Sequence, residues 1–151
     1  FNDRAGIRMQ HIPYGGGAPL MAAFLGGQIH AAFVTGLDGA ALLQSGKVKY
    51  LAVSTPAPTE IVPGVPAIAQ DLSGFTSVCW FGVLAPKGVP DEVAAKLQAA
   101  IAAAVKRPEV RKMFIDRKVE PRSSTPEEFE NLIKDDVNQW GPVVRKAKIQ
   151  M

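Results

Sequence analysis

The sequence predicts an α/β fold with a mainly parallel sheet. Strand-like and helix-like segments alternate at short spacing through the first half of the chain, and glycines mark the turns between them. The chain has 151 residues, 47% hydrophobic and 21% charged, which is ordinary for one globular domain with a core. A βαβ alternation of this kind favours parallel strands joined by right-handed crossovers.

The first half of the chain carries the βαβαβ pattern. Strands are predicted at residues 7–14, 29–34 and 48–55, and helices at residues 18–25 and 37–45. Glycines follow both helices, Gly26-Gly27 after the first and Gly46 after the second. A left-handed or tight turn is expected at these glycines, because such turns commonly end helices.

A proline-rich segment separates this region from the second half. Four prolines fall within residues 56–66, so an extended surface loop is predicted there, followed by a short helix around residues 66–72. The run "FTSVCWFGVLAP", residues 75–86, comes next. Its length and apolar character predict either a buried central strand or a strand that crosses between two lobes.

Two helices are predicted directly after this run. Apolar residues recur every four positions from Val93 to Val105, in a helix that Pro90-Asp91-Glu92 opens and Lys106-Arg107 closes. A second short helix is predicted from Pro108 to Lys118. The acidic start and basic end of the first helix suit the helix dipole.

The last helix has the clearest start signal in the chain. In "TPEEFENLI", Thr125 is the predicted N-cap, Pro126 the first helical residue and Glu128 the partner in a capping box. One face of this helix is apolar and is expected to pack as core: Phe129, Leu132, Ile133, Val137, Trp140 and Val144.

Charge and motifs exclude several function classes. A net charge of +3 without a run of like charges gives little support for nucleic-acid binding. Gly46-Lys47 lies at a helix end and is followed by Val48, so it is no Walker A loop. Leu20 occupies the position of the third glycine in a dinucleotide fingerprint. No nucleotide cofactor is expected.

The residues that usually carry catalysis or bind metals are few. His11 and His30 are the only histidines, and neither has a second ligand or an acidic partner at a suitable spacing. Cys79 is the only cysteine and lies in an apolar run, which favours buried packing over chemistry. We therefore expect no catalytic residue, no metal site and no cofactor.

The stretch "YGGGAP" is the strongest candidate for a binding loop. It comprises Tyr14, Gly15, Gly16, Gly17, Ala18 and Pro19, directly before a predicted helix. Backbone N–H groups at a helix N-terminus bind anions, and glycine lets a ligand approach them closely. A plain turn without a ligand is the alternative. Trp80 is likewise either ordinary packing or an aromatic wall of a pocket.

Six stretches of the sequence resemble, in order and spacing, a known family. They are "HIPYGGGAP", "LGGQI", "SGKVKYLAVST", "VPGVPAIAQ", "WFGVLAPKGVP" and "STPEEF". This combination resembles the Bug family of periplasmic solute-binding proteins, the substrate-binding receptors of tripartite tricarboxylate transporters. The resemblance covers essentially the whole chain.

The resemblance implies a periplasmic-binding-protein-like (type II) fold of two α/β lobes that close around a small carboxylate. The family's receptors are about twice this length, so the chain is expected to match their C-terminal half, with the N-terminal half absent. Residues 1–78 would then be part of the second ligand-binding lobe. Residues 79–151 would hold the crossing strand and the C-terminal helices that return to the first lobe.

The resemblance also implies site residues, a location and partners. Tyr14 to Pro19 match the loop that holds the ligand carboxylate, Phe33 and Thr35 match a strand end that faces the cleft, and Trp80 matches the strand that returns between lobes. The implied protein is periplasmic, is not an enzyme, and delivers a carboxylate to a membrane permease. Exposed surface left by the absent lobe would favour a homo-oligomer.

Some positions depart from the family's pattern, and other functions stay open. His30 and Val34 stand where the family commonly has Asp, Ala67 and Gln70 replace a common Thr and Glu, and residues 57–60 lack the usual Arg. One alternative is a diverged or truncated member that acts as an interaction or remnant domain without a ligand. An α/β enzyme fragment is a third, disfavoured because no acid–base or nucleophile pattern is present.

Overall fold

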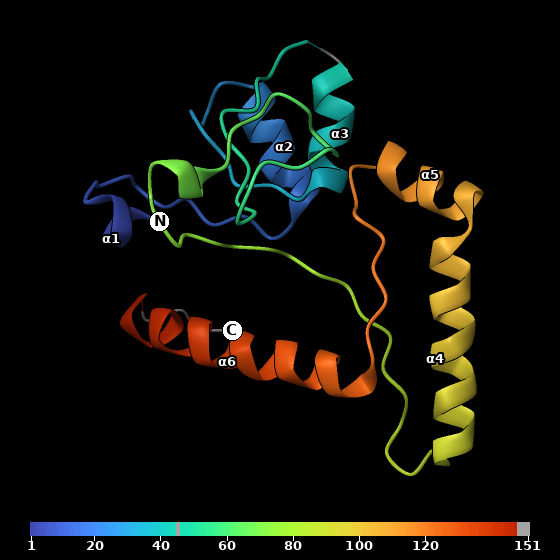
Figure 1. Ribbon diagram of the computed structural model, residues 1–151. Helices are drawn as coiled ribbons and strands as arrows, with labels where there is room; N and C mark the ends of the chain where they lie inside the picture. The colour runs from blue at the N-terminus through green and yellow to red at the C-terminus, as the bar shows by residue number, and fades with distance from the viewer. Residues whose placement is uncertain (45, 148–151) are drawn as a thin grey trace. The chain divides into compact units, whose positions relative to one another are not determined.

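The computed structural model, drawn in Figure 1, describes residues 1–44 and 46–147. The chain divides into two compact units. The N-terminal unit consists of Phe1–Gly82 together with Met113–Glu120. The C-terminal unit consists of Val83–Lys112 and the segment from Pro121 onward. Residues 113–120 thus belong to the N-terminal unit, and the division into lobes at residue 78 that the resemblance implies stays a prediction.

Short helices joined by extended segments build the N-terminal unit. They are α1 (Asn2–Ala5), α2 (Gly17–Leu25), α3 (Gly36–Gln44) and the 3-10 helix η1 (Ile68–Gln70). Helices α2 and α3 confirm the predictions for residues 18–25 and 37–45, except that residue 45 lies outside the described residues. Gly27 and Gly46 adopt φ angles of 73° and 67°, so the predicted glycine turns are also confirmed.

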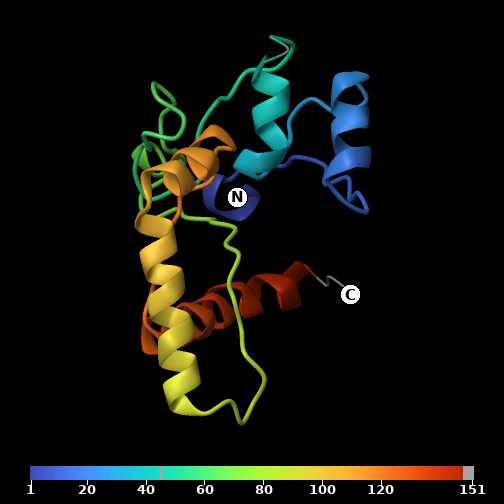
Figure 2. The same cartoon turned by 90° about the vertical axis from the view of Figure 1, so that its right-hand side faces the viewer.

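The later helices begin and end close to the residues that the sequence predicted. They are α4 (Asp91–Lys106), α5 (Pro108–Asp116) and α6 (Pro126–Ala147). Arg107 has a ψ of 132°, outside the helical region, because a proline disfavours a helical backbone at the residue before it. The resulting break between α4 and α5 is visible in Figure 2. Helix α5 stops two residues before the predicted end, since Lys118 takes a left-handed φ of 59°.

The predicted capping box of α6 is formed. The N–H of Thr125 donates to Oε2 of Glu128 at 2.8 Å, and the N–H of Glu128 donates to Oγ1 of Thr125 at 3.1 Å. These reciprocal bonds satisfy two donors at the start of the helix.

None of the described helices combines the length and the apolar character that a membrane span requires.

The predicted parallel sheet is not formed by the described residues. Their single β-bridge joins Val53 to Ala67 in parallel, through bonds from Val53 N–H to the Pro66 carbonyl (2.8 Å) and from Ile68 N–H to the Val53 carbonyl (2.9 Å). The segments predicted as strands, residues 7–14, 29–34, 48–55 and 75–86, are extended without a ladder. An apolar pattern favours an extended backbone, but a strand also needs a neighbour to bond with.

The hydrophobic core of the N-terminal unit is small. Among the described residues, its buried apolar side chains are Ala23, Leu42, Ala67 and Phe75. Phe1 packs edge-on against Phe75 and Phe33, with ring centroids 5.7 and 5.5 Å apart. Cys79 is exposed, contrary to the prediction of buried packing, because the strand in which it was expected to be covered has no sheet around it.

Glycines allow close packing around α3. A Cβ on Gly36 would collide with the carbonyl of Lys118, and a Cβ on Gly39 would collide with the hydroxyl of Tyr50. The Tyr50 hydroxyl is buried and has no hydrogen-bond partner among the described residues. Burial disfavours the phenolate, so the pKa of Tyr50 is raised above its usual value.

The helices of the C-terminal unit leave their apolar stripes largely uncovered. On α4, Val93 and Leu97 are 45% and 51% exposed, and on α6 Val137 is 66% exposed. Phe129 and Trp140 are half-buried, so the prediction of a packed core face on α6 is wrong for this unit. The stripe is amphipathic as predicted, but nothing among the described residues buries it fully.

Tyr50 makes unfolding sensitive to alkaline pH. Since burial raises its pKa in the folded chain, its contribution to the free energy of unfolding is complete below the unfolded pKa of about 10 and is lost as the pH rises through the folded value. We expect Tyr50→Phe to lose less free energy of unfolding between pH 8 and pH 11 than wild type. Denaturant unfolding at both pH values measures this.

Tyr14→Phe is the matched control for that experiment, because it makes the same change at the other tyrosine of the chain. At pH 8, Tyr50→Phe should be neutral or more stable by up to about 1 kcal/mol, because the mutation removes a buried hydroxyl without a partner. A Tyr50→Phe variant with the same alkaline loss as wild type would contradict the assignment.

Candidate functional site

The glycine loop leads directly into α2. Gly16 is the N-cap residue, with φ 153° and ψ 179°, a backbone conformation essentially restricted to glycine. Gly17 is the first helical residue, and Pro19 lies in the first turn, where its missing N–H is tolerated. Gly15 and Gly16 are exposed, while Tyr14 and Gly17 are half-buried. Solvent therefore reaches the backbone at the start of α2.

The start of α2 has no side-chain cap. The N-cap residue offers no side-chain hydrogen bond, and the first turn holds no acidic residue. The first N–H groups of a helix have no partner within the helix, and their summed dipole attracts negative charge. This end of α2 is thus suited to a carboxylate or a phosphate.

The start of α3 is capped by its own side chains. Thr35 Oγ1 donates to Oδ2 of Asp38 at 2.7 Å and accepts from the Asp38 N–H at 3.2 Å. The Thr35 hydroxyl, predicted to face a ligand, is therefore engaged with Asp38. The capping also fixes the position of the Asp38 carboxylate.

The Asp38 side chain lies beside both predicted site segments, residues 14–19 and residues 33–35. Its Oδ1 lies 2.9 Å from the point that a Cβ of residue 17 would occupy, and its Cγ lies 3.1 Å from the same point. The carboxylate thus stands beside the first residue of α2. We did not predict Asp38 as a site residue, although T-x-x-D before an apolar helical run is a recognisable capping signal.

Phe33 and Trp80 lie in the same unit as the loop. Phe33 comes two residues before Thr35, is 58% exposed and packs edge-on against Phe1. Trp80 is 36% exposed and follows Ser77, whose N–H donates to the Ser54 carbonyl at 2.9 Å. Contact of either ring with a ligand stays a prediction.

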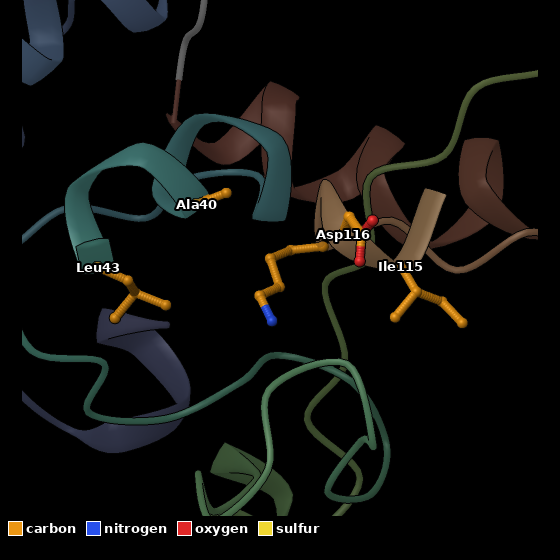
Figure 3. A pocket seen from close by; sticks show the side chains of 5 residues that line it. Ala40, Leu43, Ile115 and Asp116 are labelled. Atoms are coloured by element: carbon orange, nitrogen blue, oxygen red, sulfur yellow. The ribbon is translucent and has the colours of Figure 1, made fainter. Parts of the chain in front are cut away.

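A separate pocket lies between α3 and the end of α5 (Figure 3). Ala40, Leu43, Ile115, Asp116 and Lys118 line it, and its volume is about 490 Å³. The ammonium of Lys118 donates to the carbonyl of Ile61 at 3.0 Å. None of the lining residues is a predicted site residue, so the pocket adds no group to the glycine loop.

His11 and His30, the two histidines weighed for catalysis or metal binding, are both exposed. Within the described residues, no three His, Cys, Asp or Glu side chains gather where they could hold a metal ion.

The contact between Asp38 and Gly17 should appear as an energetic coupling. We expect Gly17→Ala to destabilise wild type by about 1 kcal/mol but to be neutral in an Asp38→Ala background, because neighbouring residues commonly couple by 0.5 kcal/mol or more. Chemical denaturation of the four chains gives the coupling. Gly15→Ala is the control, since a Cβ there meets nothing within 4 Å. Coupling below about 0.3 kcal/mol at position 17 would show that the two residues do not touch.

Curated relatives match nearly the whole chain. BugT of Bordetella pertussis is 29% identical over 148 residues, which cover 97% of this chain and 45% of that protein. A protein encoded in the clcB-clcD intergenic region of Pseudomonas knackmussii is 27% identical over 143 residues, covering 93% of this chain and 85% of that one. The chain therefore spans less than half of BugT but most of the shorter relative.

Solved structures share the backbone arrangement. A Rhodopseudomonas palustris protein, Rpa4515 with adipate, has a TM-score of 0.86 at 25% identity, over 98% of this chain and 50% of that one. MatC from Rhodopseudomonas palustris with bound malate has a TM-score of 0.72 at 28% identity, over 95% and 50%. The periplasmic binding protein BugD has a TM-score of 0.78 at 28% identity, over 99% and 51%.

The fold is thus that of about half of a periplasmic binding protein, which confirms the resemblance inferred from the six sequence stretches. Residues 1–149 match the family described as the tripartite tricarboxylate transporter family receptor. The chain therefore belongs to the tripartite tricarboxylate transporter receptor family.

Proposed function

We propose that this chain supplies part of the carboxylate-binding site of a periplasmic receptor, which captures a small carboxylate without catalysis and delivers it to a membrane permease. The single observation that carries the proposal is the uncapped, glycine-lined start of α2. Backbone N–H groups there can bind a carboxylate without a basic side chain. A net charge of only +3 is compatible with this mode of binding.

Relatives support the ligand class. One structural neighbour carries adipate and another carries malate, and both are small dicarboxylates. Residues 1–78 would form part of the second lobe of such a receptor, and residues 79–151 would return to the first lobe. The loop from Tyr14 to Pro19, with Phe33, Thr35 and Trp80, would then face the cleft where the lobes close around the ligand.

Titration of the ¹⁵N-labelled chain with adipate and with malate tests the proposal. The amide signals of Gly15 to Ala18 should shift in a saturable way. Gly16→Ala should weaken binding about tenfold or more, because its φ of 153° is unfavourable for alanine and the loop must rearrange at a cost of 1–3 kcal/mol.

Gly64→Ala is the matched control, because Gly64 also has a positive φ, 77°, and open space around it but lies outside the proposed binding loop. Its affinity should stay within about twofold of wild type, which corresponds to less than 0.5 kcal/mol. No amide shift in wild type with either acid, or equal losses in the two variants, would refute the glycine loop as the binding site.

We also propose that the chain associates with a second copy of itself, as an interaction domain would. Phe81, Val83 and Leu84 are 78%, 74% and 74% exposed in one extended segment. A contiguous run of exposed apolar side chains is the kind of surface that marks contact with another protein.

Sedimentation velocity over a concentration series tests this association. Wild type should form a dimer, and Phe81→Ser with Leu84→Ser should raise the dissociation constant about tenfold or more, because each apolar side chain contributes roughly 1.5–3 kcal/mol when buried. Lys87→Ser, in the same segment, is the control. A wild-type chain that remains monomeric at the highest concentration would rule the dimer out.

A further inference from the structure

We propose that two copies of the chain pair antiparallel along α4, so that the basic junction of α4 and α5 in each copy lies against the acidic first half of α6 in the other. The inference rests on the self-association proposed above. It deepens that proposal by naming the surface that pairs and the charges that set its orientation. All of this surface belongs to the C-terminal unit.

Positive and negative charges are separated within the C-terminal unit. Residues 106–112 hold four basic residues and one acidic residue, a net charge of +3. Residues 127–136 hold five acidic residues and one lysine, a net charge of −4. The basic patch consists of Lys106, Arg107, Arg111 and Lys112, and the acidic patch of Glu127, Glu128, Glu130, Asp135 and Asp136. These side chains are exposed, except for the half-buried Asp136.

The helix dipoles account for only part of this separation. Glu127 and Glu128 suit the positive start of α6, but Asp135 lies in the third turn, beyond the reach of the dipole. Arg111 lies in the first turn of α5, where the dipole disfavours a positive charge. Opposite charges on a partner would account for both placements.

The two patches are separated along α4. The amide of Gln98 donates to the carbonyl of Ser124 at 3.0 Å, which places the start of α6 beside the middle of α4 (Figure 2). Lys106 follows about 12 Å further along the helix, at roughly 1.5 Å per residue. This exceeds the screening length of about 8 Å in physiological salt, so the patches attract each other only weakly within one chain.

Four charges of the patches form no ion pair among the described residues: Lys106, Arg111, Glu127 and Asp135. Glu130, by contrast, is paired with Lys134 at 2.7 Å. The four side chains are also exposed, so a partner can reach them.

An exposed apolar stripe on α4 accompanies the patches. Val93, Leu97 and Ile101 recur every four residues and are 45%, 51% and 37% exposed. A second α4 can cover this stripe by helix packing. A parallel copy would bring like patches together, whereas an antiparallel copy brings each basic patch to the acidic patch of its partner. The antiparallel pair has two-fold symmetry, so the charge contact is made twice.

Charge reversal in the full chain tests this pairing. One variant reverses the basic patch, with Lys106→Glu and Arg111→Glu, and a second reverses the acidic patch, with Glu127→Lys and Asp135→Lys. In sedimentation velocity, each variant alone should show a dimer dissociation constant about tenfold or more above that of wild type, because attraction between the patches becomes repulsion.

An equimolar mixture of the two variants is the decisive measurement. The two reversed patches are complementary to each other, and so are the two patches that were left unchanged. The mixed dimer should therefore recover a dissociation constant within about threefold of wild type. Arg8→Glu with Lys49→Glu, the same charge change at exposed residues of the N-terminal unit, is the control and should stay within about twofold of wild type.

Other outcomes overturn the inference in distinguishable ways. If wild type dimerises but neither reversal weakens the dimer, or if the mixture is no tighter than either variant alone, the pairing of the patches is wrong and the proposed self-association stands. If wild type remains monomeric, the self-association fails and the inference fails with it. Lys106→Ala with Arg111→Ala replaces the reversed basic variant if the amide spectrum shows that variant to be unfolded. An unchanged dissociation constant for the alanine variant also overturns the pairing.

Discussion

Helix α3 lies where it does because glycines allow other parts of the chain to touch its backbone. The Lys118 carbonyl packs against Gly36, and the Tyr50 hydroxyl packs against Gly39. Lys118 adopts a left-handed φ of 59°, which costs roughly 1–2 kcal/mol for a residue with a side chain. Its ammonium bond to the Ile61 carbonyl helps to hold this conformation. These contacts position the start of α3, and with it Asp38, beside Gly17.

The starts of α2, α3 and α6 are satisfied in different ways, and this difference distinguishes the candidate site. Helix α4 also lacks a side-chain cap, but Asp91 and Glu92 lie in its first turn. Helix α6 begins with the reciprocal bonds of Thr125 and Glu128, and α3 begins with those of Thr35 and Asp38. Helix α2 begins on glycine without a side-chain cap. Its N–H groups remain available to an external acceptor. A ligand carboxylate would therefore be bound more strongly at the start of α2 than at the start of α3 or α6.

The extended segments explain why the two units expose so much apolar surface. A strand with apolar residues on both faces is stable only between neighbouring strands and covering helices. The described residues provide one bridge, at Val53 and Ala67, and leave Phe81, Val83 and Leu84 exposed. Structural relatives of about twice the length share this backbone arrangement over half of their chains.

The sequence by itself determined most of the helices and their ends, because capping residues, glycine turns and apolar periodicity act within a few residues along the chain. The family followed from the resemblance of six stretches to known receptors. It also indicated the glycine loop, since three glycines before a helix need no distant contact to be recognised. Only the tertiary structure decided that the extended segments lack a sheet and that Cys79 and the stripe of α6 are exposed. It also decided that Asp38, twenty-one residues from Gly17, stands beside it. Pairing and burial depend on which surfaces meet, and local pattern carries no information about that.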